Sequence, residues 1–372
     1  MEATAGAGDG GMEVVVFPWL AFGHMIPLPP VPPHLSARLR FISLPLPTVD
    51  GLPEGAESTA DVPAEKIELL KRAMDGLAAP LDAFLADEYN VPCAAFLIVH
   101  AGFVAFLGPR EAEWLVGAFR ANASGVSDMD RVWGMFERCH LTIYRSCEEV
   151  DPGMFALLTE LIGKPAVPAG VLLPPVAAAA DDGRDEVLRW LDEQPPKSVI
   201  YVALGSEAPL TLKNLHELAL GLELTERRRA ARRVRGATGE RTRGRGMVQT
   251  GWVPQVASLA HGATGGFLTH CGWGSTVESF ASGLPLVMIP FIIDQPLVAR
   301  AMEEKGIGVE VERYDTDGLF DRDGVAAAVR RVMLDEEGKV LASNARKLKE
   351  VLADQAAQER YIDDLVENLR RH

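Results

Sequence analysis

The sequence predicts an α/β protein of two doubly wound, Rossmann-like domains that face a cleft, with an incomplete N-terminal sheet. Three observations lead to this fold class. First, 372 residues suffice for two domains of ordinary size. Second, apolar strand-like runs alternate with helical patterns, which is typical of parallel sheets. Third, a Pro- and Ala-rich stretch over 163–182 divides the chain and has the composition of a linker.

In the first half, residues 12–17 predict a buried strand that runs into the loop 18–24. Five prolines within 27–33 then replace the expected crossover helix, because proline blocks a helix interior. The apolar run 93–107 is typical of a buried strand followed by a helix. Further helical patterns cover 63–89, 111–120 and 128–138.

In the second half, residues 198–204 predict a strand, Gly205 and Ser206 a turn, and 212–222 a helix. Strands are then expected near 265–269, 285–291 and 307–311, helices near 275–282, 295–305 and 323–334, and a helical tail over 337–371. We therefore expect an N-terminal domain (1–172), a linker (173–184), a C-terminal domain (185–354) and a C-terminal helix (355–372).

Composition and charge exclude several classes of protein. The chain is 48% hydrophobic and 24% charged, which is typical of a globular protein and not of a disordered one. Its net charge of −15 argues against nucleic acid or anionic membranes as partners. The apolar run 93–107 is too short to span a membrane. Four cysteines without a C-x-x-C pair fit a reducing compartment. No Lys or Arg precedes Arg38, so the positively charged start of a secretory signal is missing, and we expect a cytoplasmic protein without such a signal. We also expect a monomer.

Nine arginines lie between Arg227 and Arg245, where the topology calls for a strand. This run could bind phosphate or nucleic acid. It lacks interleaved aromatic residues, so an exposed loop is the favoured interpretation.

The densest cluster of unusual residues covers 252–295. A strand ends near Leu268 and a helix is expected to begin at Ser275, with Gly272 and Gly274 in the turn between them. A helix N-terminus with bare glycines is a ready anion site, and His270 adds a hydrogen-bond donor.

Other residues of the cluster fit the remaining parts of a nucleotide. Trp252 could stack on a base, and Glu278 could accept hydrogen bonds from both ribose hydroxyls. Each residue also has a structural interpretation. Ser275 and Glu278 match a capping box, Trp252 could lie in the core, His270 could be a satisfied buried imidazole, and Asp294 could cap a helix.

The stretch from Trp252 to Gln295 closely resembles the plant secondary-product signature of the UDP-dependent glycosyltransferases. It keeps the signature's Trp, Gln, His, His-Cys-Gly-Trp block, Glu and closing Asp-Gln at the expected spacing. The resemblance extends to 18–24, 44–63, 197–224 and much of 301–372. The chain is most similar to the subgroup that adds a sugar to a plant glycoside. The resemblance implies a GT-B fold whose N-terminal domain binds the acceptor and whose C-terminal domain binds the UDP-sugar.

The resemblance also implies a role for each matching residue. Trp252 would stack on uracil, the backbone of Val253 would contact its edge, and Gln255 and Glu278 would hold the ribose. Ser206, His270 and Ser275, with the glycine turn of Gly272 and Gly274, would bind the diphosphate. Trp273, Asp294 and Gln295 would bind the sugar. The closing Gln is associated with glucose, so UDP-glucose is the expected donor.

His24 matches the family's catalytic base. A neutral imidazole can take a proton from an acceptor hydroxyl as that hydroxyl attacks the sugar C1, with inversion at the anomeric carbon. The expected acceptor is a small plant metabolite of flavonoid or terpenoid type, or its glycoside. No cofactor and no metal are expected.

The sequence departs from the family pattern in four places. Gly274 stands where the signature usually has Asn. The strand that would carry an acidic partner for His24 is missing between Glu88 and Val91. The proline run 27–33 replaces a helix, and the arginine run replaces a strand.

These departures keep a second hypothesis open, which is a degenerate homologue that binds UDP-sugar weakly or not at all. A third hypothesis, a metal-dependent transferase, rests on Asp-x-Asp at 128–130, 315–317 and 321–323. A nucleic-acid-binding role of the arginine run ranks last.

Overall fold

The computed structural model describes residues 44–59, 61–88, 94–97, 119–122, 125–173, 185–205, 208, 210–225, 230–232, 246–249, 251, 253–292, 294–314 and 319–371. Of the predicted site, His24, Ser206 and Trp252 lie outside the described residues. The same holds for the predicted strand 12–17, the proline run 27–33 and most of the predicted helix 111–120.

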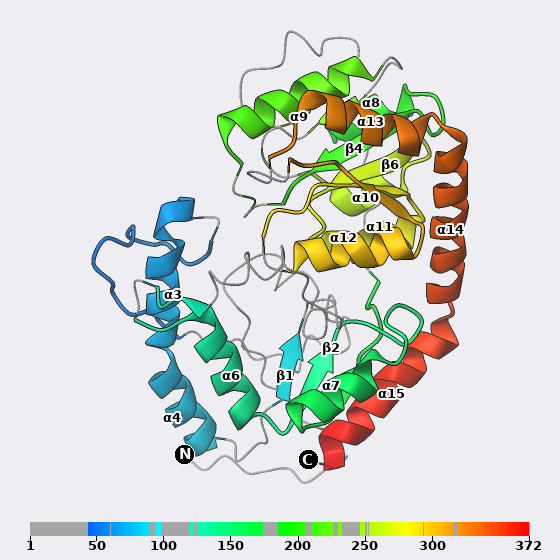
Figure 1. The fold of residues 1–372 in the computed structure, drawn as a ribbon. Coiled ribbons are helices and arrows are strands. Elements are labelled where there is room, and N and C mark those ends of the chain that lie inside the picture. Colours follow the sequence, from blue (N-terminus) through cyan, green and yellow to red (C-terminus); the bar gives the residue numbers. More distant parts are fainter. Residues whose placement is uncertain are drawn as a thin grey trace.

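The C-terminal half forms a five-stranded parallel sheet in the order β5-β4-β6-β7-β8 (Figure 1). This is the order of a doubly wound sheet, and its switch point lies between β4 and β6. The predicted strands are all present, although three are shorter than expected: β4 (Val199–Ala203), β6 (Thr264–Thr269), β7 (Leu286–Met288) and β8 (Gly308–Glu310).

Helices cover both faces of this sheet because successive strand side chains point to opposite sides. Phe267 packs in one hydrophobic cluster and its neighbour Leu268 in the other. The first cluster lies under α8 (Glu186–Asp192), α10 (Gln255–Ala260), α11 (Trp273–Ser282) and α12 (Gln295–Glu304). The second lies under α9 (Leu212–Leu224) and α13 (Arg322–Met333). The α/β prediction with parallel sheets is therefore confirmed.

The arginine run contributes an edge strand. Ala230–Arg232 forms β5 and pairs in parallel with β4, Ile200 opposite Ala230. The expectation of an exposed loop is wrong for these three residues, because the edge of a parallel sheet offers backbone hydrogen bonds even to a segment of weak strand propensity.

The N-terminal half has a second parallel sheet, in the order β1-β2-β3. β1 (Ala94–Leu97) and the fully buried β2 (Leu141–Tyr144) are followed by β3 (Ala166–Pro168). β3 lies inside the Pro- and Ala-rich stretch 163–182, before the expected linker (173–184) begins. Proline is tolerated there because β3 is an edge strand of this sheet.

The helices beside this sheet modify two predictions. The expected helix 63–89 is divided into the 3-10 turn η1 (Ala64–Lys66), α3 (Ile67–Asp75) and α4 (Ala78–Glu88). The break comes at Gly76, where a Cβ would lie 2.8 Å from Cγ of Pro47. The helix predicted over 128–138 is confirmed as α6 (Asp128–Arg138), and α7 (Met154–Ile162) was not predicted.

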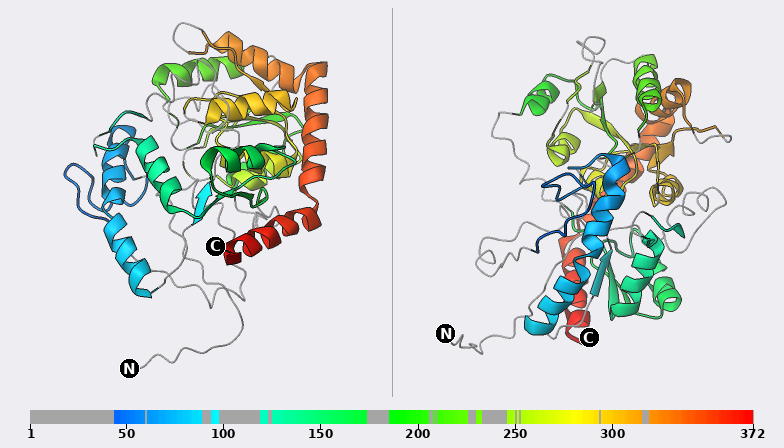
Figure 2. Two further views of the ribbon diagram at one scale, coloured as in Figure 1. Left: turned by 60° about the horizontal axis from the view of Figure 1, so that its bottom comes forward. Right: turned by 90° about the vertical axis from the view of Figure 1, so that its left-hand side faces the viewer.

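The last two helices connect the halves of the molecule. α14 (Glu336–Leu352) descends along one side, and α15 (Gln355–Arg371) passes under the N-terminal sheet (Figures 1 and 2). Leu365 and Leu369 pack against β2, and the Tyr361 hydroxyl donates to Glu149 (2.9 Å). The C-terminal helix therefore covers the N-terminal sheet.

Among the described helices, none combines the length and the apolar character that crossing a bilayer requires.

Candidate functional site

The turn between β6 and α11 has no side chain at the N-cap position that would cover the N-terminus of the helix. Cys271 has a left-handed φ of 66°, and its N–H donates to Oγ1 of Thr269 (3.2 Å), which stabilises this uncommon conformation. Gly272 is the N-cap residue and provides no side-chain cap. The first-turn N–H groups of an α-helix have no intrahelical partner, so this end favours an anion.

α11 begins at Trp273 rather than at Ser275, so the expected capping box does not form. The Gln255 amide instead donates to Glu278 Oε2 (2.7 Å) and to Ser275 Oγ (3.2 Å). Burial raises the pKa of Glu278, while the hydrogen bond from Gln255 and the charge of Arg145 act against that rise. The structure thus joins three predicted site residues from α10 and α11 into one polar cluster.

His270 lies at the switch point of the sheet, between the chain that leaves β4 and the turn that enters α11. A Cβ on Gly205 would lie 2.6 Å from its Nε2, and one on Gly272 would lie 2.5 Å from the same atom. Only glycine at both positions leaves room for the ring. Gly205 also has a left-handed φ of 70°.

The His270 ring is uncharged at neutral pH. Its Nδ1 is buried and has no hydrogen-bond partner among the described residues. Burial lowers the pKa of His270 to about 4. A satisfied core histidine does not fit these facts, because a buried polar atom in a native structure usually has a partner. The ring can offer a hydrogen bond to a ligand, but it does not provide a positive charge.

This pKa predicts an acid sensitivity of the fold. Between pH 6.5 and 4 the unfolded chain takes up a proton at His270 and the native chain does not, so the free energy of unfolding falls as the pH falls. We expect this loss to be about 2 to 3 kcal/mol, and to be absent in His270→Gln. Urea unfolding of both chains across this pH range measures it. The exposed His140→Gln is the control, and parallel curves for the unchanged chain and His270→Gln would contradict the prediction.

The three residues expected to bind the sugar differ in their burial and in the hydrogen bonds they make within the protein. Trp273 is 3% exposed, and its indole N–H donates to the main-chain oxygen of Arg145 (2.7 Å), so this donor is used inside the protein. The side-chain oxygen of Gln295 accepts from the N–H groups of Phe291 and Ile292 (2.8 and 3.1 Å). Asp294 precedes α12 as its N-cap residue, without a side-chain cap. Its neighbour Gln295 is held at the same helix start.

Sequence reasoning missed Arg145, which directly follows β2 and is 4% exposed. The only signal was an apolar, β-branched run, Leu141–Tyr144, followed by a basic residue. Val253 is buried and lies two residues before Gln255, the first residue of α10.

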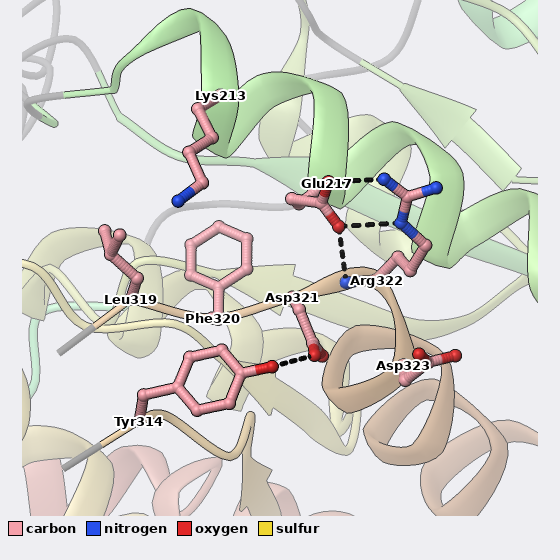
Figure 3. Close-up of a pocket in the computed structure, with 8 residues that line it drawn as sticks. All are labelled: Lys213, Glu217, Tyr314, Leu319, Phe320, Asp321, Arg322 and Asp323. Atoms are coloured by element: carbon pink, nitrogen blue, oxygen red, sulfur yellow. Dashed lines mark hydrogen bonds and ion pairs between the residues drawn. The ribbon is translucent and has the colours of Figure 1, made fainter. Parts of the chain in front are cut away.

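A separate pocket of about 300 Å³ lies between α9 and the start of α13 (Figure 3). Glu217 accepts two hydrogen bonds from the Arg322 guanidinium (2.8 and 2.6 Å) and one from its N–H (3.0 Å). These bonds lower the pKa of Glu217 to about 2. No predicted site residue lines this pocket, and its ion pair joins the two helices.

Two of the Asp-x-Asp hits cap helices. Asp130 belongs to the capping box of α6, and Asp321 caps α13 by accepting from the Gly324 N–H (2.8 Å). The third hit, 315–317, lies outside the described residues. Within the described ranges, no three His, Cys, Asp or Glu side chains form a possible metal site.

A doubly wound sheet with an anion-favouring helix end at its switch point is the architecture of a nucleotide-binding enzyme. The model of the UDP-glucoronosyl and UDP-glucosyl transferase family matches residues 175–360. UDP-glycosyltransferase 91C1 of Arabidopsis thaliana is 34% identical, with 96% of each chain covered. The soyasaponin III rhamnosyltransferase of Glycine max is 30% identical, with 98% of this chain and 96% of that one covered.

Solved structures agree on the fold. UGT2 of Phytolacca americana, complexed with UDP-2fluoro-glucose and pterostilbene, has a TM-score of 0.63 at 24% identity, covering 87% of this chain and 86% of that one. UGT73P12 of Glycyrrhiza uralensis has a TM-score of 0.70 at 19% identity, covering 88% and 83%. The chain belongs to the UDP-glycosyltransferase family, has its GT-B fold and is a glycosyltransferase.

The internal deletions expected from the sequence agree with the alignments. The match to UDP-glycosyltransferase 91C1 runs over 447 positions, more than the 372 residues of this chain. The relative therefore contains segments that this chain lacks.

Proposed function

We propose that this chain transfers glucose from UDP-glucose to a hydroxyl of a small plant secondary metabolite or its glycoside, with inversion at the anomeric carbon. The family supplies the coarser part, UDP-sugar transfer to small metabolites. The observation that carries the proposal is the cluster of Gln255, Ser275 and Glu278 beside the bare glycine turn of α11.

The uridine would lie against this cluster. Glu278 is held by one hydrogen bond from Gln255, which leaves carboxylate acceptors for the ribose hydroxyls. Trp252 would stack on uracil, and the backbone of Val253 would contact the edge of the base. Val253 lies two residues before Gln255 in the chain, which supports this assignment.

The diphosphate would lie at the N-terminus of α11. Main-chain N–H groups at Gly274 and Ser275, the hydroxyl of Ser275 and the ring of His270 are the donors, with Ser206 from the β4 side. Such donors stabilise the charge that develops on the departing diphosphate. The sugar would then contact the start of α12 at Asp294 and Gln295, together with main-chain groups of Trp273.

His24 would act as the general base, and no metal or cofactor is part of the proposal, because hydrogen-bond donors at the helix end would stabilise the diphosphate. We further propose a cytoplasmic monomer. A second candidate, a homologue that binds UDP-sugar without turnover, is favoured by one observation: the chain lacks segments that its relatives contain.

A transfer assay with a panel of glycosides and flavonoid-like acceptors separates the two candidates. We expect a β-linked glucoside by proton NMR, and faster reaction with UDP-glucose than with UDP-galactose. Heat of UDP binding without any product would select the second candidate. Product formation that a chelator abolishes would contradict the metal-free proposal.

A further inference from the structure

Arg145 contacts the end of the N-terminal domain through its side chain and α11 through its main chain. Arg145 directly follows β2, and its Nε and Nη2 donate to the carbonyl oxygens of Val171 (3.1 Å) and Leu172 (3.0 Å). Leu172 has a left-handed φ of 47°, which the bond from Arg145 helps to hold. The main-chain oxygen of Arg145 accepts from Trp273 on α11. The N-terminal domain therefore holds the guanidinium, and α11 of the C-terminal domain contacts the main chain of the same residue.

The third nitrogen, Nη1, faces the N-terminus of α11. A Cβ built on Gly274 would lie 3.9 Å from Nη1 of Arg145. Apart from the neighbouring residues and the backbone of α11, no other heavy atom of the described residues lies within 4 Å of that Cβ. Nη1 has no hydrogen-bond partner among the described residues. Gly274 thus leaves an open path between this nitrogen and the helix end.

The charge of Arg145 is not neutralised by a direct ion pair in the described part of the chain. Both of its hydrogen bonds go to neutral carbonyls, and Glu278 acts on it only through longer-range attraction. Burial lowers the pKa of Arg145 to about 10, so it remains a cation at neutral pH. A cation that is 4% exposed without a counter-ion is costly, and a bound anion would offset that cost.

We propose that Arg145 binds the diphosphate of the UDP-sugar, with Nη1 donating to a phosphate oxygen in the space above Gly274. The inference rests on the proposed function. Arg145 would supply the positive charge that the neutral His270 and the N-terminus of α11 do not supply. The N-terminal domain thereby contributes to donor binding.

Calorimetry with UDP and uridine tests the proposal on the whole chain, because the two ligands differ by the diphosphate alone. In Arg145→Gln we expect UDP affinity to fall about 10- to 100-fold, and uridine affinity to change less than threefold. Arg145→Lys, which keeps the charge, should retain part of the preference for UDP. Arg131→Gln, which removes a surface arginine bound to Asp75, is the matched control and should change neither affinity.

The outcomes distinguish this inference from the proposed function. If the unchanged chain binds neither UDP nor uridine, the proposed function fails and this inference fails with it. If the unchanged chain binds UDP, and Arg145→Gln weakens UDP and uridine equally, Arg145 only holds the backbone of Val171 and Leu172, and this inference alone is overturned.

Gly274→Asn provides a test that does not depend on the folding of an Arg145 variant, since a Cβ at Gly274 meets no close contact. If Arg145 already serves the phosphate, the added amide should change UDP affinity less than threefold. In Arg145→Gln, the same amide should restore part of the lost affinity. UDP binding that tightens tenfold or more in Gly274→Asn alone would show an unfilled phosphate position and overturn the inference.

Discussion

A His24→Ala variant should transfer sugar about 10²- to 10⁴-fold more slowly than the unchanged chain and bind UDP with the same affinity. The imidazole is proposed to remove the acceptor proton, and His24 is not among the residues proposed to bind UDP. Single-turnover kinetics with saturating UDP-glucose measures the chemical step, and calorimetry measures UDP binding.

The exposed His140→Ala is the matched control, since it removes a histidine from the same half of the chain. A loss of less than threefold in His24→Ala would assign the base to another residue. The size of the loss also bears on the missing acidic partner. An imidazole without an orienting carboxylate is a weaker base catalyst, so a value near the lower end is expected if no other carboxylate replaces it.

Trp273→Ala should lower the free energy of unfolding by about 3 to 5 kcal/mol. The indole is 3% exposed, packs edge-on against Phe280 and donates to Arg145 across the domain junction. Removing it leaves a cavity and a buried carbonyl oxygen without its donor. Because whole domains are stable by only about 5 to 15 kcal/mol, this single change would remove much of the margin.

Urea unfolding followed by circular dichroism measures this loss of stability. One further variant isolates the contribution of the hydrogen bond, and a second serves as a control. Trp273→Phe keeps an aromatic ring and loses the hydrogen bond, so it should cost about 1 to 3 kcal/mol. Trp133→Ala is the control: this tryptophan is 51% exposed on α6 and should cost less than about 1 kcal/mol. Equal losses for Trp133→Ala and Trp273→Ala would contradict the assignment of Trp273 to the core.

Where the local pattern and the tertiary environment agree, the sequence predicted the fold well. Strand β6 and helix α6 both form within a residue or two of the expected ranges. The failures come where tertiary contacts override composition. β3 forms in a proline-rich stretch because β2 offers it hydrogen bonds, and Gly76 breaks a helical pattern where Pro47 packs against it.

The candidate site shows the same division. The order of glycines, His270 and Glu278 along the chain indicated an anion site followed by a carboxylate, because glycines at a strand-to-helix turn leave the N–H groups of the helix N-terminus accessible to an anion. The pattern also suggested a capping box for Glu278. Only the folded chain shows that Gln255, twenty-three residues earlier, is its partner instead.

The sequence by itself determined the family, the doubly wound architecture and the segment that carries the nucleotide-sugar site, since all three depend on residue types and spacings within one stretch of chain. The tertiary structure decided which groups meet. It placed the cation of Arg145 over Gly274, directed the Trp273 indole to the domain junction and enclosed His270 between two glycines. These contacts join residues up to 128 positions apart, and no local pattern specifies a contact between segments that only the packing of two domains brings together.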